Sequence, residues 1–248
     1  MPQKQPEQSF PLVLAHWRSD ESRAKAETCF TLDDQQTLSE STRSCSIVMP
    51  AGDEARVHQL LADGAMRVLI GDAALLDGTL IRRLAEQYGS ERIGVVVLAR
   101  KHNVTWTLDM VSNADFRCLT PSYGKRGWEL MLSQGDGTGT DAEWWLGEML
   151  ACGASAALIQ VDMQDDDLNI CAGLLESHGN KLWFAPWQQP DIDLEPWVRY
   201  GQVRQLLLPE PNNRDAVEMA RIRAAAESEE ERHAAVVADA GEKEKAAA

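Results

Sequence analysis

The chain has 248 residues, of which 44% are apolar, and this is enough to bury the core of one globular domain. It carries 39 Asp and Glu residues against 24 Lys and Arg residues, which gives a formal net charge of −15. Nucleic acids and anionic membrane surfaces repel such a chain, so we exclude both as partners. No apolar run reaches the roughly 18 residues of a membrane-spanning helix, and the first residues do not resemble a signal peptide. We therefore expect a cytoplasmic protein.

Five cysteines are scattered along the chain, at Cys29, Cys45, Cys118, Cys152 and Cys171. Their number is odd and no CxxC pair occurs, so the spacing favours neither a disulfide framework nor a zinc site. We expect buried free thiols, and the sequence indicates no cofactor and no metal.

Residues 46–100 alternate short apolar runs with longer amphipathic ones. The short runs are uniformly apolar, which is typical of parallel strands buried on both faces, and lie at Ile47–Met49, Val68–Ile70 and Ile93–Ala99. The segments between them have apolar residues at helical spacing. Gly64 and Gly89 follow these segments and are able to take the left-handed conformation that ends a helix. The pattern predicts β-α-β-α-β.

The alternation resumes further along the chain. Thr140 or Asp141 is a suitable cap for a helix that Gly153 ends. Later helices are expected at Leu168–His178 and Leu194–Tyr200, and strands at Ala156–Val161, Leu182–Ala185 and Gln205–Leu208.

Three segments break this pattern. Residues 101–126 combine strand-like and turn-forming residues, and we interpret them as an insertion that carries a hairpin. Residues 18–45 are polar and contain no convincing buried strand, although Phe10–His16 resembles one. Residues 214–248 are rich in Ala, Glu, Arg and Lys and predict a charged helix that becomes disordered. We therefore expect one domain over 1–213, followed by this tail.

Two stretches carry a family resemblance. The first is LLADGAMRVLIGDAALLDGTLIRRLAEQYGSERIGVV, which includes Gly71, Ala73 and Ala74, and the second is GWELML, with Gly127 and Trp128. Both resemble the histidine-biosynthesis barrels, namely the phosphoribosylformimino-aminoimidazole carboxamide ribotide isomerase and the cyclase subunit of imidazole glycerol phosphate synthase. The resemblance implies a TIM-type (β/α)8 barrel with its site at the carboxyl ends of the strands. Because residues 18–45 are so polar, we expect this barrel to be irregular or incomplete near its first two strands.

The resemblance also implies two phosphate sites built from glycine-rich loops, and these loops differ here. The positions implied to bind substrate are Gly52, Gly71, Asp72 and Trp187. Gly52 is followed by two acidic residues, and Asp72 stands where the family has a small hydroxyl residue. After the seventh strand Pro186 and Trp187 replace two glycines, and after the eighth Pro209 and Glu210 replace Gly-Arg. Acids and prolines at these positions oppose phosphate binding.

The family's acid–base pair, one Asp at the end of the first strand and one at the end of the fifth, is absent as well. The first position falls near Leu14, with His16 the nearest possible replacement base, and the second falls on Leu98. Catalytic candidates are therefore Asp72, Asp162, Asp165 and His16. The run Asp165, Asp166, Asp167, with Asp162 before it, has oxygen ligands that suit a hard cation, but its place before a helix favours capping.

Two further features concern partners and ligands. Trp144 and Trp145 are adjacent on a predicted helix and point about 100 degrees apart, so one faces the core and the other faces outward, where an interface is possible. The glycine-rich segment 133–141 matches neither GxGxxG nor the P-loop, and we interpret it as an ordinary strand-to-helix connection.

These losses together favour a catalytically degenerate barrel that acts as a binding, assembly or regulatory subunit, with a protein partner or a second copy of itself. The alternative is a barrel enzyme of isomerase or lyase type on a different small molecule, with Asp72, Asp162 or Asp165 as its acids. The resemblance links this alternative to one-carbon or pterin metabolism, where relatives of the isomerase also occur. The original ribotide isomerase is the least favoured hypothesis.

Overall fold

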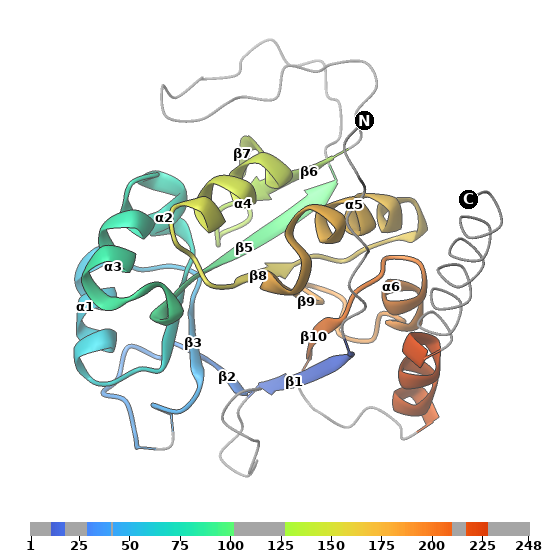
Figure 1. Ribbon diagram of the computed structural model, residues 1–248, viewed down its shortest axis with the longest axis horizontal. Coiled ribbons are helices and arrows are strands. Elements are labelled where there is room, and N and C mark those ends of the chain that lie inside the picture. The colour runs from blue at the N-terminus through green and yellow to red at the C-terminus, as the bar shows by residue number, and fades with distance from the viewer. Residues whose placement is uncertain (1–10, 18–28, 41, 102–126, 210–216, 228–248) are drawn as a thin grey trace, which may run out of the picture.

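A computed structural model describes residues 11–17, 29–40, 42–101, 127–209 and 217–227 (Figure 1). Eight parallel strands form a closed barrel, in which β4 pairs with β5 to complete the ring. In order around the barrel they are β4 (Arg67–Ile70), β3 (Ser46–Met49), β2 (Cys29–Leu32), β1 (Val13–Trp17), β10 (Gln205–Leu208), β9 (Leu182–Ala185), β8 (Ala157–Gln160) and β5 (Ile93–Lys101). The predicted TIM-type (β/α)8 fold is confirmed.

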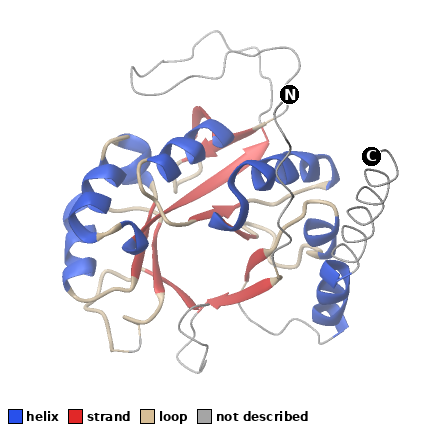
Figure 2. Ribbon diagram, in the orientation of Figure 1, coloured by secondary structure: helices blue, strands red, loops and turns tan. Residues whose placement is uncertain are grey.

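Helices surround the barrel on its outer side (Figure 2). They are α1 (Glu54–Ala62), α2 (Asp72–Leu76), α3 (Leu80–Tyr88), α4 (Ala142–Ala151), α5 (Leu168–His178) and α6 (Glu195–Arg199), with 3₁₀ turns at Ser90–Arg92, Asp165–Asp167 and Gly179–Lys181. Gly64 and Gly89, which follow α1 and α3, both have φ of +92°. Their predicted role at helix ends is confirmed, since other residues rarely adopt this conformation.

Side chains alternate between two apolar layers along each strand. In β5, Val95 and Val97 belong to the layer beneath the helices, whereas Val96 belongs to the cluster inside the barrel. Large rings help to fill the interior, where Phe30 and Trp183 make an edge contact with ring centroids 5.0 Å apart. The interior of the barrel is therefore a packed core, and a ligand site must lie toward the carboxyl ends of the strands.

The polar segment 18–45 does contribute a strand, and the expectation that it contains none is wrong. Within it, β2 buries Cys29 and Phe30, and β1 pairs with β2 at two positions, His16 with Cys29 and Trp17 with Phe30. The strand has four residues, of which only the first two are buried, so its apolar pattern is too short to recognise. The barrel wall is complete at this point, although the pairing there is short.

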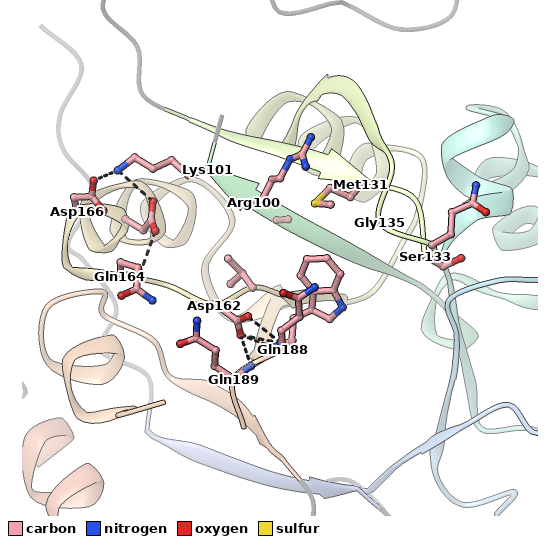
Figure 3. A pocket seen from close by; sticks show the side chains of 15 residues that line it. Arg100, Lys101, Met131, Ser133, Gly135, Asp162, Gln164, Asp166, Gln188 and Gln189 are labelled. Carbon is pink, nitrogen blue, oxygen red and sulfur yellow. Dashed lines mark hydrogen bonds and ion pairs between the residues drawn. The ribbon is translucent and has the colours of Figure 1, made fainter. Parts of the chain in front are cut away.

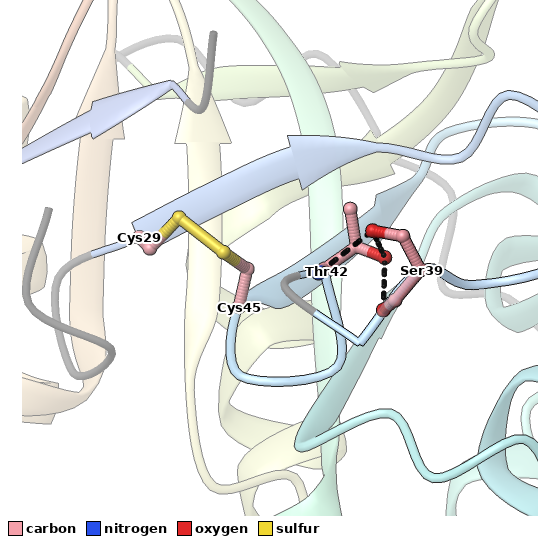
Figure 4. Close-up of a disulfide and its surroundings, with 4 residues drawn as sticks. All are labelled: Cys29, Ser39, Thr42 and Cys45. Carbon is pink, nitrogen blue, oxygen red and sulfur yellow. Dashed lines mark hydrogen bonds between the residues drawn. A yellow bond between two sulfur atoms is a disulfide. The ribbon is translucent and has the colours of Figure 1, made fainter. Parts of the chain in front are cut away.

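Cys29 and Cys45 form a disulfide that joins β2 to the residue before β3 (Figure 4). The prediction of free thiols is wrong for this pair, because parallel pairing of β2 and β3 brings residues 16 positions apart into contact. Cys152 and Cys171 are free, and Cys118 lies outside the described residues.

Two antiparallel strands, β6 (Trp128–Met131) and β7 (Gly137–Asp141), extend the sheet outside the barrel. Leu98 of β5 pairs with Gln160 of β8 and also with Met131 of β6. These two partners occupy opposite edges of β5, and the edge opposite β8 is the one with which β4 pairs. The β6–β7 hairpin therefore lies on the β4 side of β5, beyond the end of β4. Segment 133–141 is thus partly a strand rather than a simple connection. The hairpin predicted within 101–126 falls almost entirely on residues that are not described.

The first part of the tail, residues 217–227, is a helix. Its residue Ile222 is fully buried, and Arg221 makes ion pairs with Asp193 and Glu195 near α6. The predicted domain boundary at 213 and the predicted disorder after 227 fall outside the described residues.

Candidate functional site

A cavity of about 720 Å³ opens at the carboxyl ends of β5 and β8 (Figure 3). One wall comes from the β6–β7 hairpin and another from the loop after β9. Its lining combines charged, amide and apolar groups, from Ala99, Arg100, Lys101, Met131, Ser133, Gln134, Gly135, Val161, Asp162, Gln164, Asp166, Asp167, Trp187, Gln188 and Gln189. The location is the one at which (β/α)8 barrels carry their sites, and the volume suits a small molecule.

Asp162, which follows β8, accepts hydrogen bonds from three consecutive backbone amides of the loop after β9. Its Oδ1 lies 2.8 Å from the Trp187 nitrogen and 3.3 Å from that of Gln189, and its Oδ2 lies 2.9 Å from that of Gln188. Successive amides that converge in this way form an anion-binding nest. Here the chain's own carboxylate fills the nest, so these amides do not face a free ligand.

Asp72, at the start of α2, holds the hairpin loop. Its Oδ1 accepts a hydrogen bond of 2.8 Å from the Ser133 amide, and its Oδ2 accepts one of 2.6 Å from the Ser133 hydroxyl. The Asp72 carboxylate therefore ties the end of β4 to the hairpin that forms the cavity wall.

Gly52 and Gly71 do not line the cavity. The Gly71 amide donates to the Met49 carbonyl, and the Asp72 amide donates to the Pro50 carbonyl. A Cβ at Gly71 would lie 2.2 Å from the Pro50 oxygen, so glycine is required there by a close approach of two backbones. Gly52 has a φ of +139°, which other residues rarely adopt, so the backbone accounts for both glycines without any ligand.

The charged side chains at the end of β5 are paired with acids on β6 and on the 3₁₀ turn before α5. Both Nε and Nη2 of Arg100 lie 3.2 Å from Oε2 of Glu129. Lys101 forms an ion pair with Asp166, as Figure 3 shows. Asp167, which is 4% exposed, accepts a hydrogen bond of 3.1 Å from the Gln164 amide.

Asp167 also acts on the neighbouring core. Burial, together with the charge of Asp167, raises the pKa of the Cys171 thiol well above its ordinary value. Cys171 therefore stays protonated, which suits a packing role and opposes a nucleophilic one.

Two further candidates do not line the cavity. His16 is half-buried, and Asp165 is exposed and stands in the chain between two lining residues, Gln164 and Asp166. His16 alternates with Ala15 and Trp17, which pack inside the barrel, so it faces the outer layer. By the same alternation Leu98 faces the barrel interior, where the resemblance implies a catalytic Asp. The structure thus brings Asp162 and Trp187 together at the cavity, which His16, Asp165 and the two glycines do not line.

Trp145 is 1% exposed and belongs to the core, whereas Trp144 is half-buried at its edge. The predicted difference between the two is found. An interface role for Trp144 stays a prediction, since the structure holds one chain.

Sequence reasoning missed Arg100, Lys101 and the glutamines of the lining. The signal for the first two was the basic pair that directly ends the apolar run of β5. The signal for Gln188 and Gln189 was the polar pair that follows Trp187 at a predicted strand end. Neither pair stands out without the register that places them beside the hairpin.

Within the described residues, no group of three or more His, Cys, Asp or Glu side chains is arranged to hold a metal ion. No helix in the described part of the chain is long and apolar enough to cross a membrane. A comparison of the sequence with models of protein families finds no match, and a comparison with characterised proteins finds no significant one. These comparisons therefore assign the chain to no family, and what the structure shows is the TIM-type fold.

Proposed function

We propose that this protein is a catalytically degenerate barrel of the histidine-biosynthesis type that acts as a binding, assembly or regulatory subunit. One observation carries the proposal: Asp162, the candidate acid that reaches the cavity, accepts three backbone hydrogen bonds in place of a ligand. A carboxylate that accepts hydrogen bonds from three loop amides holds the loop in place and is not free to approach the reacting atoms of a substrate.

The other acid at the strand ends supports the same conclusion. Asp72 is engaged by both polar groups of Ser133 and serves to anchor the hairpin. With Leu98 at the fifth strand, the pair of free carboxyl groups that the isomerisation requires has no counterpart in this arrangement. In the described part of these loops, the amides of residues 187–189 bind the Asp162 carboxylate, and those of Gly71 and Asp72 bind backbone carbonyls.

The test uses the purified full chain and the family's ribotide. We expect no turnover of the ribotide. We also expect calorimetry to detect no binding of ribose 5-phosphate at about millimolar concentration, so that any binding free energy is weaker than about 4 kcal/mol. Measurable isomerisation, or micromolar binding of either compound, would contradict the proposal. A catalytically active isomerase assayed in parallel verifies the ribotide.

A barrel enzyme that acts on a different small molecule is the second candidate. The observation in its favour is that Lys101 and Asp166, an ion pair, line the same cavity. If this pair transfers a proton, incubation with a metabolite extract should deplete one compound and accumulate another by mass spectrometry. Lys101→Met should then abolish the conversion without changing the melting temperature.

For partners, we propose a homo-oligomer or a complex with another protein, and the half-buried Trp144 is the residue that supports a contact on α4. We propose a cytoplasmic location. The disulfide between Cys29 and Cys45 is the observation against that location, because thiols are kept reduced in most cytoplasms.

A further inference from the structure

We propose that the cavity binds an uncharged, planar, nitrogen-containing ring of the nucleobase class, stacked on Trp187 and hydrogen-bonded by Gln188 and Gln189. The inference deepens the proposed function and rests on it, because it names the ligand of a binding subunit. It assigns no reaction to the site.

The loop after β9 presents three side chains to the cavity. Trp187, Gln188 and Gln189 are consecutive, and all three line the cavity. Asp162 binds the backbone amides of all three, so a single carboxylate fixes the loop that presents one indole and two carboxamides. A ligand that meets a loop already fixed in place pays less conformational entropy on binding.

The indole and the two carboxamides of this loop have a chemistry that suits the edge and the face of a base. A carboxamide offers a donor and an acceptor in one plane, the arrangement by which Gln pairs with the edge of adenine. An indole provides a flat face on which a base stacks, and this stacking contributes to the binding free energy for any of the bases. An indole and two carboxamides on one loop therefore suit a flat ring with donors and acceptors on its edge.

The charged side chains that line the cavity favour an uncharged ligand. The cations that line the cavity are already neutralised, Arg100 by Glu129 and Lys101 by Asp166. Asp162, beside the loop, adds a negative charge, and both of its oxygens accept hydrogen bonds from the loop amides. A phosphate group would have to displace one of these carboxylates, whereas an uncharged ring displaces none. The site should therefore prefer the unphosphorylated ring.

The experiment uses the full chain, with adenine, hypoxanthine and cytosine as probes, in calorimetry and tryptophan fluorescence. We expect at least one ring to bind with a dissociation constant between about 0.1 and 1 mM and to quench fluorescence, the range that one stacking and one paired contact give together. The 5′-monophosphate of that base should bind at least about tenfold more weakly. Trp187→Leu should weaken ring binding by about tenfold or more, and Gln188→Leu by about fivefold. The matched control is Tyr200→Leu, which removes an exposed aromatic side chain outside the cavity and should leave binding unchanged.

Several outcomes would overturn the inference. One is that none of the three rings binds, and another is that the monophosphate binds more tightly than its base. A third is that glucose binds and the rings do not. The last is that Trp187→Leu binds the ring as tightly as the unmodified chain does while the melting curves of the two proteins are the same. The proposed function fails on a different result, namely turnover of the ribotide. Refusal of the rings together with refusal of the ribotide would reject only the present inference.

Discussion

Replacement of Asp162 by Ala tests the arrangement on which the site depends. The variant leaves three backbone amides without the acceptor that they share. A hydrogen bond to a charged group contributes about 1.5–3 kcal/mol when it is protected from water. Gln188 and Gln189 are exposed and their amides regain water, so only the bond from the half-buried Trp187 counts in full. We expect a loss of about 2–3 kcal/mol in the free energy of unfolding.

For a chain of this length such a loss corresponds to a fall of roughly 5–10 °C in melting temperature. Circular dichroism during thermal and urea denaturation measures both quantities. Asp162→Asn keeps one acceptor oxygen and loses the charge, and should cost about half as much. Asp165→Ala is the matched control, since this exposed acid lies outside the cavity and its loss should cost about 0.5 kcal/mol or less. If Asp162→Ala is no more costly than this control, the carboxylate does not hold the loop.

Reduction of the disulfide between Cys29 and Cys45, 16 positions apart, should lower the free energy of unfolding by about 3 kcal/mol, measured in urea with and without reductant. Equal stability in the two states would show that the bond constrains little. Deletion of residues 228–248 should change stability by about 0.5 kcal/mol or less, and a loss of several degrees in melting temperature would mean that this segment docks on the barrel. Trp145→Glu should unfold the protein because it buries a charge, while Trp144→Glu should leave it folded and dissociate the assembly. Sedimentation as the same species before and after Trp144→Glu would exclude this contact.

Most barrel strands were predictable because each is a short apolar run between helical segments. The predicted ranges Leu182–Ala185 and Gln205–Leu208 are those of β9 and β10 in the structure. β2 escaped prediction because its identity as a strand depends on its neighbours: Cys29 and Phe30 are buried by β1 and β3, while Leu32 is 56% exposed. Such a strand is set by tertiary pairing rather than by local pattern.

The site was less predictable than the fold, for a reason that Asp162 illustrates. Its position after a barrel strand marked it as a functional candidate, yet the sequence does not show what its carboxylate contacts. The partners are the amides of residues 25–27 positions later, and a backbone amide carries no signature of residue type. The same holds for Asp72 and Ser133, which are 61 positions apart.

The cavity lies at the carboxyl ends of β5 and β8, to one side of the barrel axis, and the packing and hydrogen bonds described above explain this position. In the barrel centre, Trp183 and Phe30 fill the space, so a ligand has no place on the axis below the strand ends. β5 continues past the point where β8 pairs with it, and this extension carries Arg100 and Lys101 and pairs with β6. Asp72 then fixes the hairpin on one side, and Asp162 fixes the loop with Trp187 on the other. Two acids at strand ends, where a barrel enzyme would keep its proton-transfer groups, thus each fix one wall of the cavity. This use of the acids supports the proposed binding role, because a cavity between loops keeps its shape only when both loops are held.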